Sequence, residues 1–365
     1  MYTEMVKIIE GGLQGDKTKI LNYATVLANN LEQQGNPALS KKIRNILTER
    51  KGQLTSLDYF TAKPVDTESR LEMVEITTPS IEIDKIVLNK HIAAEINSFI
   101  GCYQKRDLLL KAGVETPASI LLYGPPGCGK TTIAQYISTV MELPLVCARL
   151  DGLVSSLLGS TAKNIRKIFD YVSSRECILF LDEFDVIAKL RDDKNELGEL
   201  KRVVNSLIQN IDSLNTNTIL IAATNHHELL DPAIWRRFTK VLRLEKPNEE
   251  EIITFIQIVL DGTNNNVLDN IRKLELLASA FNDFSFSEIK TIILNVIKNS
   301  IIHETGIVNY SEIIKEIYMY SNHNIAEEAF LSYLLRYKVT QEEISSIGIP
   351  LRKIRKVSKE GKKGD

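Results

Sequence analysis

A glycine-rich segment with a lysine and two threonines is the first part of the sequence whose residue types and spacing indicate chemistry. It matches the pattern GxxxxGK[ST] and consists of Gly124, Pro125, Pro126, Gly127, Cys128, Gly129, Lys130, Thr131 and Thr132. In such a segment backbone N–H groups face phosphate oxygens, the lysine reaches the β- and γ-phosphates, and the first threonine hydroxyl ligates magnesium. We therefore expect these nine residues to bind ATP phosphates, with Thr131 as a ligand of Mg²⁺.

Two adjacent carboxylates, Asp182 and Glu183, follow the apolar run 177–181. Ligands of open parallel sheets bind beyond the carboxyl ends of the strands, so both acids should lie beside the phosphate-binding segment. There Asp182 can hold magnesium through its water shell, while Glu183 orients and deprotonates the attacking water. The two segments together predict hydrolysis of ATP to ADP and phosphate.

A polar residue also ends the next apolar run, where Asn225 follows Thr224. This side chain would emerge at the same sheet edge, and we interpret it as the group that senses the γ-phosphate or the attacking water. A turn or a cap is the other use of an asparagine at such a position. The two histidines that come next, His226 and His227, are interpreted as loop residues because no third metal ligand is near them.

Two consecutive arginines, Arg236 and Arg237, follow a short predicted helix that begins at Asp231-Pro232. The site described so far is complete without them, so we expect them to stabilise transition-state charge in the site of a neighbouring subunit, as an arginine finger does. Salt bridges on the subunit's own surface are the alternative. The sequence leaves open which of the two reaches the phosphate.

The elements around these residues alternate between strands and helices. Apolar, β-branched runs at 119–123, 145–148, 178–181, 218–222 and 241–244 alternate with helical stretches that include those from 130 and 162. This predicts an α/β fold in which a parallel sheet of the P-loop NTPase kind has helices on both faces. After Pro247 the pattern is helical, with helices expected at 249–260, 268–281 and 285–303, which indicates an α-helical lid.

The chain divides into four expected parts. Residues 1–75 form a small all-α N-terminal module and a linker, residues 76–247 the α/β nucleotide-binding domain, residues 248–325 the lid, and residues 326–365 C-terminal helices with a basic tail. The stretch from Lys51 to about Thr78, with few large apolar residues, is interpreted as the linker. The N-terminal helices could recruit a client or partner, or could simply enlarge a ring.

Composition is ordinary for a soluble globular protein: of 365 residues, 44% are hydrophobic and 25% charged. No apolar run approaches the roughly 20 residues of a membrane span, and the first residues do not resemble a signal peptide. We therefore expect a cytoplasmic location and no membrane association. The four cysteines form no CxxC pair, so neither a zinc site nor a disulfide framework is predicted.

The C-terminal end carries local positive charge, although the formal net charge is only -2. Between Leu351 and Lys363 seven lysines and arginines accompany a single glutamate. Helices expected at 327–337, 340–347 and 351–359 faintly resemble a helix-turn-helix, which would place the last helix in the major groove of DNA. DNA binding through this tail is one possibility, and a merely solvated basic end is the other.

The segments together resemble the AAA+ ATPases, and among them the AAA clade proper, over about residues 80–300. The resemblance is carried by 86–88, 112–114, the Leu121–Pro126 run, 163–169, Leu230–Ala233 and the start of the lid helix at 284–289. It implies a ring, usually hexameric, that binds ATP between subunits, with a lid that completes the adenine pocket. It also implies a protein client or a separate partner enzyme.

Two departures from that family bear on function. The family's substrate-gripping loop has an aromatic residue where Leu157 stands, and the usual proline and glycine are missing between Arg236 and Arg237. We interpret the chain first as a homo-oligomeric ATPase that remodels or regulates a protein partner. The alternatives are a DNA-associated ATPase regulator that uses the C-terminal tail, and a slow nucleotide-dependent switch or scaffold in a defence-type system.

Overall fold

The structure is a computed structural model of the whole chain. It describes residues 63–66, 70, 72–78, 81–114, 118–149, 158–173, 175–185, 197–214, 217–322, 326–346 and 349–355, together with scattered residues between 5 and 42. Leu157 and the basic residues after Arg355 lie outside this part, so the predictions made for them stay predictions. The described residues between 5 and 42 are helical, and Leu27, Ala28 and Leu31 among them are buried.

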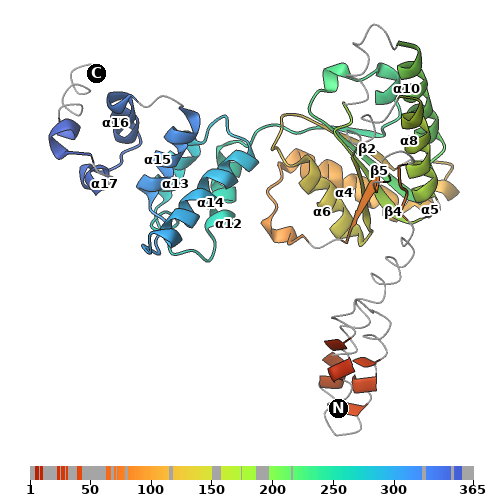
Figure 1. Cartoon of the computed structure of the whole chain (residues 1–365), viewed down its shortest axis with the longest axis horizontal. Helices are drawn as coiled ribbons and strands as arrows, with labels where there is room; N and C mark the ends of the chain where they lie inside the picture. Colours follow the sequence, from red (N-terminus) through yellow and green to blue (C-terminus); the bar gives the residue numbers. More distant parts are fainter. Residues whose placement is uncertain are drawn as a thin grey trace.

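A six-stranded sheet forms the centre of the first large unit (Figure 1). Its strands are β1 (Val74–Thr77), β2 (Ser119–Tyr123), β3 (Leu145–Arg149), β4 (Cys177–Asp182), β5 (Thr218–Thr224) and β6 (Lys240–Arg243). Their order is β1-β3-β4-β5-β2-β6, and all neighbouring pairs are parallel except β1 with β3. The α/β prediction is confirmed, and the five predicted strands are all present.

Helices cover both faces of the sheet because its strands are apolar on both sides. In β4, Leu179 and Leu181 pack toward α8 (Leu158–Ser173) and α10 (Leu197–Asp212), whereas Ile178 and Phe180 pack toward α4 (Lys90–Gln104) and α6 (Lys130–Met141). Figure 1 shows these two pairs of helices on opposite sides of the strands. Among the described residues of this unit, the other short helices are η1 (Ile83–Lys85), α5 (Arg106–Lys111), η3 (His227–Leu229) and α11 (Pro232–Trp235).

The edge strand β1 lies in the stretch that the sequence analysis assigns to a linker, so that interpretation is wrong for Val74–Thr77. The strand pairs antiparallel with β3, from Val74 opposite Ala148 to Thr77 opposite Leu145. Four residues carry too little periodicity to indicate a strand, and only their partner, about seventy residues later, makes one. The expected domain boundary near residue 75 falls inside this strand.

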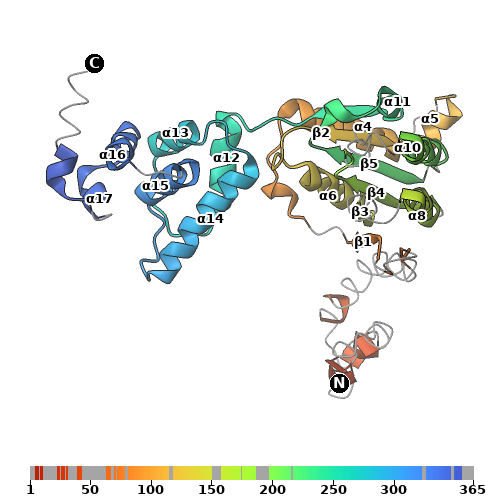
Figure 2. The same ribbon diagram turned by 45° about the horizontal axis from the view of Figure 1, so that its top comes forward.

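The second large unit is wholly helical (Figures 1 and 2). It contains α12 (Glu249–Leu260), α13 (Ile271–Ala280), α14 (Phe286–Ile302), α15 (Tyr310–Ser321), α16 (Glu327–Arg336) and α17 (Gln341–Ser346). Capping boxes start α12 and α14: Asn248 pairs with Glu251, and Ser285 pairs with Glu288. The three helices that we expect after Pro247 are present, with ends that differ by up to three residues.

The C-terminal helices share the core of the lid. Phe330, Leu334 and Ile354 belong to the same buried cluster as Ile256 and Ile292, so the expected boundary at residue 325 does not separate two cores. In the short helical stretch 351–355 Lys353 forms an ion pair with Glu327 at 2.8 Å. Part of the positive charge that suggested DNA binding is thus neutralised within the protein.

In the part of the chain that the structure describes, no helix combines the length and the apolar character needed to span a bilayer. The cytoplasmic location expected from the sequence stays a prediction.

Candidate functional site

The phosphate-binding segment joins the end of β2 to the start of α6, as the sequence predicts. Gly124, Gly127 and Gly129 have φ angles of 145°, 74° and 89°, which are strained for residues with a side chain. Gly129 is the N-cap of α6, and its conformation leaves the first N–H groups of that helix directed toward the loop. The glycines are therefore required by the backbone itself.

Close contacts are a second reason why two of these positions require glycine. A Cβ on Gly124 would lie 2.0 Å from the carbonyl oxygen of Leu244, next to β6. A Cβ on Gly127 would lie 2.6 Å from Oγ of Ser285 and 2.9 Å from Cβ of Ser287, at the start of α14. The amide of Ser287 also donates to the Gly127 carbonyl at 3.2 Å, so the lid rests directly on the loop.

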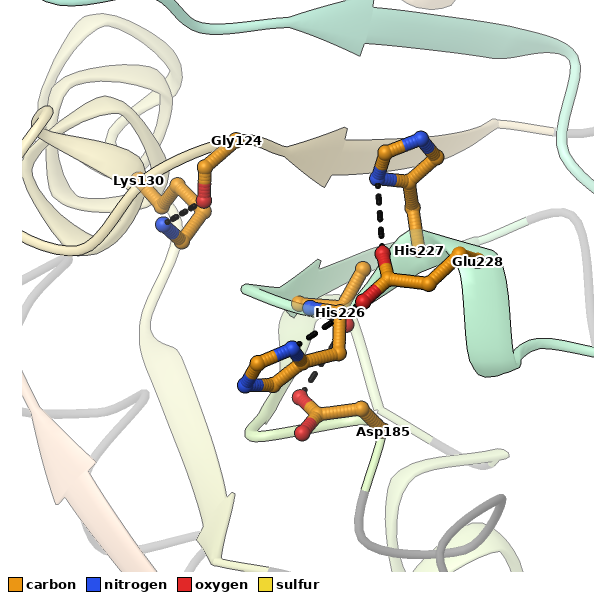
Figure 3. A network of polar contacts seen from close by, with 7 residues as sticks. Gly124, Lys130, Asp185, His226, His227 and Glu228 are labelled. Atoms are coloured by element: carbon orange, nitrogen blue, oxygen red, sulfur yellow. Dashed lines mark hydrogen bonds and ion pairs between the residues drawn. The ribbon is translucent and has the colours of Figure 1, made fainter.

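Lys130 is held inside the loop. Its Nζ donates to the carbonyl oxygen of Gly124 at 2.8 Å (Figure 3). It also donates to the carbonyl oxygen of Pro125 at 2.8 Å, and the side chain is buried. Burial lowers the pKa of Lys130, while nearby negative groups, Asp182 among them, oppose that shift. An ammonium with three donors keeps one for an added ligand, and an anion in the loop would favour the charged form.

The carboxylates emerge where β4 ends. Asp182 accepts from the Thr131 hydroxyl at 3.5 Å and from the amide of Glu183 at 2.9 Å. Glu183 has a φ of 51°, in the left-handed region, and its side chain is exposed at the cavity. A non-glycine residue in this region costs free energy, and such strain is concentrated at functional sites. Asp182 therefore contacts the phosphate loop through Thr131, whereas Glu183 is exposed at the cavity.

Asn225 lies at the end of β5, beside these acids. Its amide oxygen is buried and has no hydrogen-bond partner among the described residues. A buried polar atom without a partner costs roughly 1–3 kcal/mol, so this oxygen is suited to accept a hydrogen bond from a ligand or a water molecule. The turn-only alternative does not explain this unpaired atom.

A cavity of about 1040 Å³ joins these residues to the lid. The α/β unit contributes residues 126–133, Asp182, Glu183, Asn225 and residues 85–89, 91 and 92. The lid contributes Phe255, Ile258, Val259, Phe286, Lys290 and Leu294, and the rings of Phe255 and Phe286 meet edge to face at 4.9 Å. One end of the cavity is thus polar and charged, and the other end is apolar and aromatic.

The residues that line the cavity fit Mg²⁺ and a nucleoside triphosphate. Oxygen donors from Thr131 and Asp182 lie close together, and hard cations such as magnesium prefer such ligands. Backbone amides of the loop and Lys130 suit phosphates, and the aromatic and aliphatic end suits a base. The volume exceeds that of most small-molecule pockets and accommodates a nucleotide.

The two arginines differ in their surroundings. Arg237 donates from Nε and Nη2 to Asp212, at 3.2 and 3.3 Å, and from Nη1 to the carbonyl of Ala233 at 3.0 Å. Arg236 is exposed, and its side chain has no hydrogen bond or ion pair with any described residue. The lining of the cavity includes neither residue within the described part of the chain.

The two histidines share one carboxylate. His226 and His227 contact the two oxygens of Glu228, at 3.1 and 3.3 Å (Figure 3). A hydrogen bond from its own backbone, and then the one from His226, lower the pKa of Glu228. The ring of His227 also lies 4.6 Å from that of Tyr123 and 6.1 Å from that of Trp235. These contacts are consistent with the loop role that we assign to both histidines.

The structure brings together most of the residues expected from sequence, and Gly124 and Pro125 lie behind the lining, bound by Lys130. The sequence analysis did not include the lid residues of the cavity, such as Phe255, Phe286 and Lys290. Their spacing is that of ordinary amphipathic helices, so nothing local distinguishes them from core residues. The motif at 284–289 indicated only where the lid helix begins.

Comparison with known proteins gives one family match and several relatives. The family described as "ATPase family associated with various cellular activities (AAA)" matches residues 120–246. The "Uncharacterized AAA family ATPase y4kL" of Sinorhizobium fredii is 36% identical over 275 residues, which are 74% of this chain and 81% of that protein.

Two other relatives are longer than the region that this chain matches. The ribosome biogenesis ATPase RIX7 of Saccharomyces cerevisiae is 27% identical over 78% of this chain and 35% of its own length. Proteasome-activating nucleotidase 1 of Haloferax volcanii is 31% identical over 63% of this chain and 58% of its own length. The chain therefore spans only about a third to three fifths of these two proteins.

Proposed function

The chain belongs to the AAA family of ATPases, and on that basis we propose that it is an oligomeric ATPase whose nucleotide site is completed by an arginine of the neighbouring copy. Family membership makes it an enzyme that hydrolyses ATP and uses Mg²⁺. The observation that carries the oligomeric part is the contrast between Arg236, which is exposed and without a described partner, and Arg237, which is bound to Asp212.

Within one copy we assign separate roles to the residues of the cavity. The loop amides and Lys130 hold the β- and γ-phosphates, and Thr131 and Asp182 hold Mg²⁺, which neutralises developing phosphate charge. Glu183 accepts a proton from the attacking water, and the unpaired amide oxygen of Asn225 orients that water. The apolar end with Phe255 and Phe286 receives the base.

Between copies, Arg236 supplies the remaining positive charge. Because its guanidinium is free of ion pairs within the described part of its own chain, it can approach the γ-phosphate of a neighbour without breaking a contact. Arg237, in contrast, ties the end of α11 to Asp212 at the end of α10. We assign Arg236 as the finger and Arg237 as the residue that fixes its position.

The work done by hydrolysis concerns a protein partner. The names of two relatives refer to ribosome biogenesis and to activation of the proteasome, which are functions of those proteins. For this chain we propose, more generally, remodelling or regulation of a protein partner by a ring, which we expect to be a hexamer. Client-stimulated turnover that Leu157→Ala removes would support gripping of the client by the loop around that residue.

A mixing experiment tests the shared site. Glu183→Gln lacks the base but keeps the arginine, and Arg236→Ala lacks the arginine but keeps the base. Each variant alone should hydrolyse ATP at least about a thousandfold more slowly than the wild type. In a mixture, an Arg236→Ala subunit receives the arginine of a Glu183→Gln neighbour, so turnover should recover to a measurable part of the wild-type rate.

Light scattering with and without ATP accompanies the turnover assay. An assembly that forms with ATP, together with recovery in the mixture, supports the proposal. An Arg236→Ala variant with wild-type turnover, or a mixture that stays inactive although mixed assemblies form, contradicts the shared site. Arg237→Ala, which removes the assigned positioning contact to Asp212 but keeps the finger, should lose less turnover on its own than Arg236→Ala.

A further inference from the structure

We propose that Thr224 and Asp185, two residues outside the reacting groups, form a hydrogen-bonded brace that positions Asn225 and the turn at Glu183 for hydrolysis. This inference rests on the proposed roles of Asn225 and Glu183 in the site. Neither brace residue lines the cavity, so both are positioning residues rather than catalytic ones.

Thr224 is the junction of three segments. Its hydroxyl donates to Oδ1 of Asp185 at 3.0 Å and accepts from the amide of His226 at 3.1 Å. Its carbonyl accepts from the amide of Gly124 at 3.3 Å. One residue therefore connects the phosphate loop, the chain after the two carboxylates, and the loop that carries Asn225.

The brace holds the residues on both sides of Asn225. The hydroxyl of Thr224 holds the residue before Asn225 to Asp185 and also accepts from the amide of the residue after it, so one hydroxyl restrains the main chain on both sides of Asn225. Asn225 itself makes no described hydrogen bond through its amide oxygen. Loss of the hydroxyl would remove both of these restraints on the main chain at Asn225.

Asp185 restrains the turn at Glu183. Between them, Phe184 is fully buried and its amide donates to the carbonyl of Ala223 at 2.9 Å. Glu183 has a left-handed φ of 51°, and such a conformation persists only where its surroundings hold it. The two hydrogen bonds from β5 to residues 184 and 185 supply that restraint.

The hydrogen bond between Thr224 and Asp185 is buried. Asp185 and Thr224 are 2% and 1% exposed, so water does not readily replace either partner. A buried carboxylate is retained only if it is hydrogen-bonded, and here the hydroxyl of Thr224 is one of its donors. Figure 3 shows Asp185 beside the loop of His226, on the side away from Lys130 and Gly124.

The test compares Thr224→Val, which removes the hydroxyl at nearly constant shape, with Thr224→Ser, which keeps it. We expect kcat of Thr224→Val to fall about ten- to a hundredfold, since misplacement by about 1 Å can cost a hundredfold. The affinity for a fluorescent ATP analogue should change less than about twofold, because Lys130 and the loop amides are unaltered. Thr224→Ser should recover most of the turnover.

Combination with Asn225→Ala separates positioning from general destabilisation. If the hydroxyl acts through Asn225, Thr224→Val should lower kcat much less in the Asn225→Ala background than in the wild type. Wild-type kcat for Thr224→Val overturns the inference, and a full additional loss in the Asn225→Ala background overturns the part that concerns Asn225. Should Thr224→Val not fold, Asp185→Asn and Asp185→Ala give the same comparison, because only the asparagine keeps an acceptor for the hydroxyl.

The controls distinguish this inference from the proposed function. Wild-type turnover of Asn225→Ala and Glu183→Gln would contradict the site assignment itself, and the brace would then have nothing to position. Loss of turnover in those two variants, combined with normal kcat for Thr224→Val and Asp185→Ala, would leave the site intact and reject the brace alone.

Discussion

Replacement of Gly127 by alanine tests whether the lid must rest on the phosphate loop for ATP to bind. Gly127 has a φ of 74°, and its alanine Cβ would lie 2.6 Å from Oγ of Ser285 and 2.9 Å from Cβ of Ser287. Both contacts are too short to be tolerated, so the start of α14 must move away. That movement also removes the 3.2 Å hydrogen bond from the Ser287 amide.

Two terms contribute to the expected effect of Gly127→Ala. The left-handed conformation costs an alanine about 1–2 kcal/mol, and this term lowers stability with or without ATP. Overpacking against the lid costs about 1–3 kcal/mol. Only the overpacking weakens ATP binding, because it displaces the lid and the cavity is lined by residues of both units. A loss of about 2 kcal/mol corresponds to roughly thirtyfold lower affinity.

Gly262 provides the matched control. Its φ is 70°, but a Cβ there would meet no atom within 4 Å, so Gly262→Ala carries the backbone strain without the collision. The assay is titration of a fluorescent ATP analogue in the Glu183→Gln background, with thermal unfolding of each variant beside it. Gly262→Ala should bind as the parent does. If Gly127→Ala binds equally well, the lid does not need this contact and the reasoning fails.

Three further predictions concern the loop, the metal and the lid core. Lys130→Ala should weaken binding of the same analogue by about 2 kcal/mol or more, since hydrogen bonds to a charged group contribute about 1.5–3 kcal/mol each; unchanged affinity would contradict the assigned phosphate contact. Removal of Mg²⁺ with EDTA should abolish turnover without loss of helical circular dichroism, and turnover that persists would exclude the metal role of Asp182. Ile292→Ala should destabilise the lid by about 2–5 kcal/mol, whereas Ile301→Ala, at a position 68% exposed, should change stability by less than about 0.5 kcal/mol. Equal unfolding midpoints for these two variants would refute the description of the lid core.

Much of the fold could be predicted because its signals are local. The strands β2, β4 and β5 are continuous apolar runs. The helix α12 begins directly after an asparagine N-cap, and its first three residues are glutamates. The exception is β1, whose four residues become a strand only through pairing with β3. The division at residue 325 likewise rested on sequence spacing, whereas Ile354 packs into the lid core.

The candidate site divides in the same way. The loop from Gly124 to Thr132 and the pair Asp182 and Glu183 were identified from sequence because contiguous residues determine their backbone geometry and chemistry. The lid residues Phe255 and Phe286 were not, since they reach the cavity only after two helices fold against the α/β unit. The sequence also left the two arginines equivalent, and their difference depends on Asp212, which belongs to another helix.

The sequence by itself determined the ATPase chemistry of this protein and the residues to which we assign it: a loop for the phosphates, two carboxylates for metal and water, and an asparagine beside them. Short-range patterns suffice for this, because glycine conformations, strand ends and helix starts are encoded within a few residues. Only the tertiary structure decided how these parts are held. The hydrogen bond of Ser287 to Gly127, the pairing of Asp185 with Thr224 and the ion pair of Arg237 with Asp212 each depend on contacts between distant segments, which no local pattern specifies.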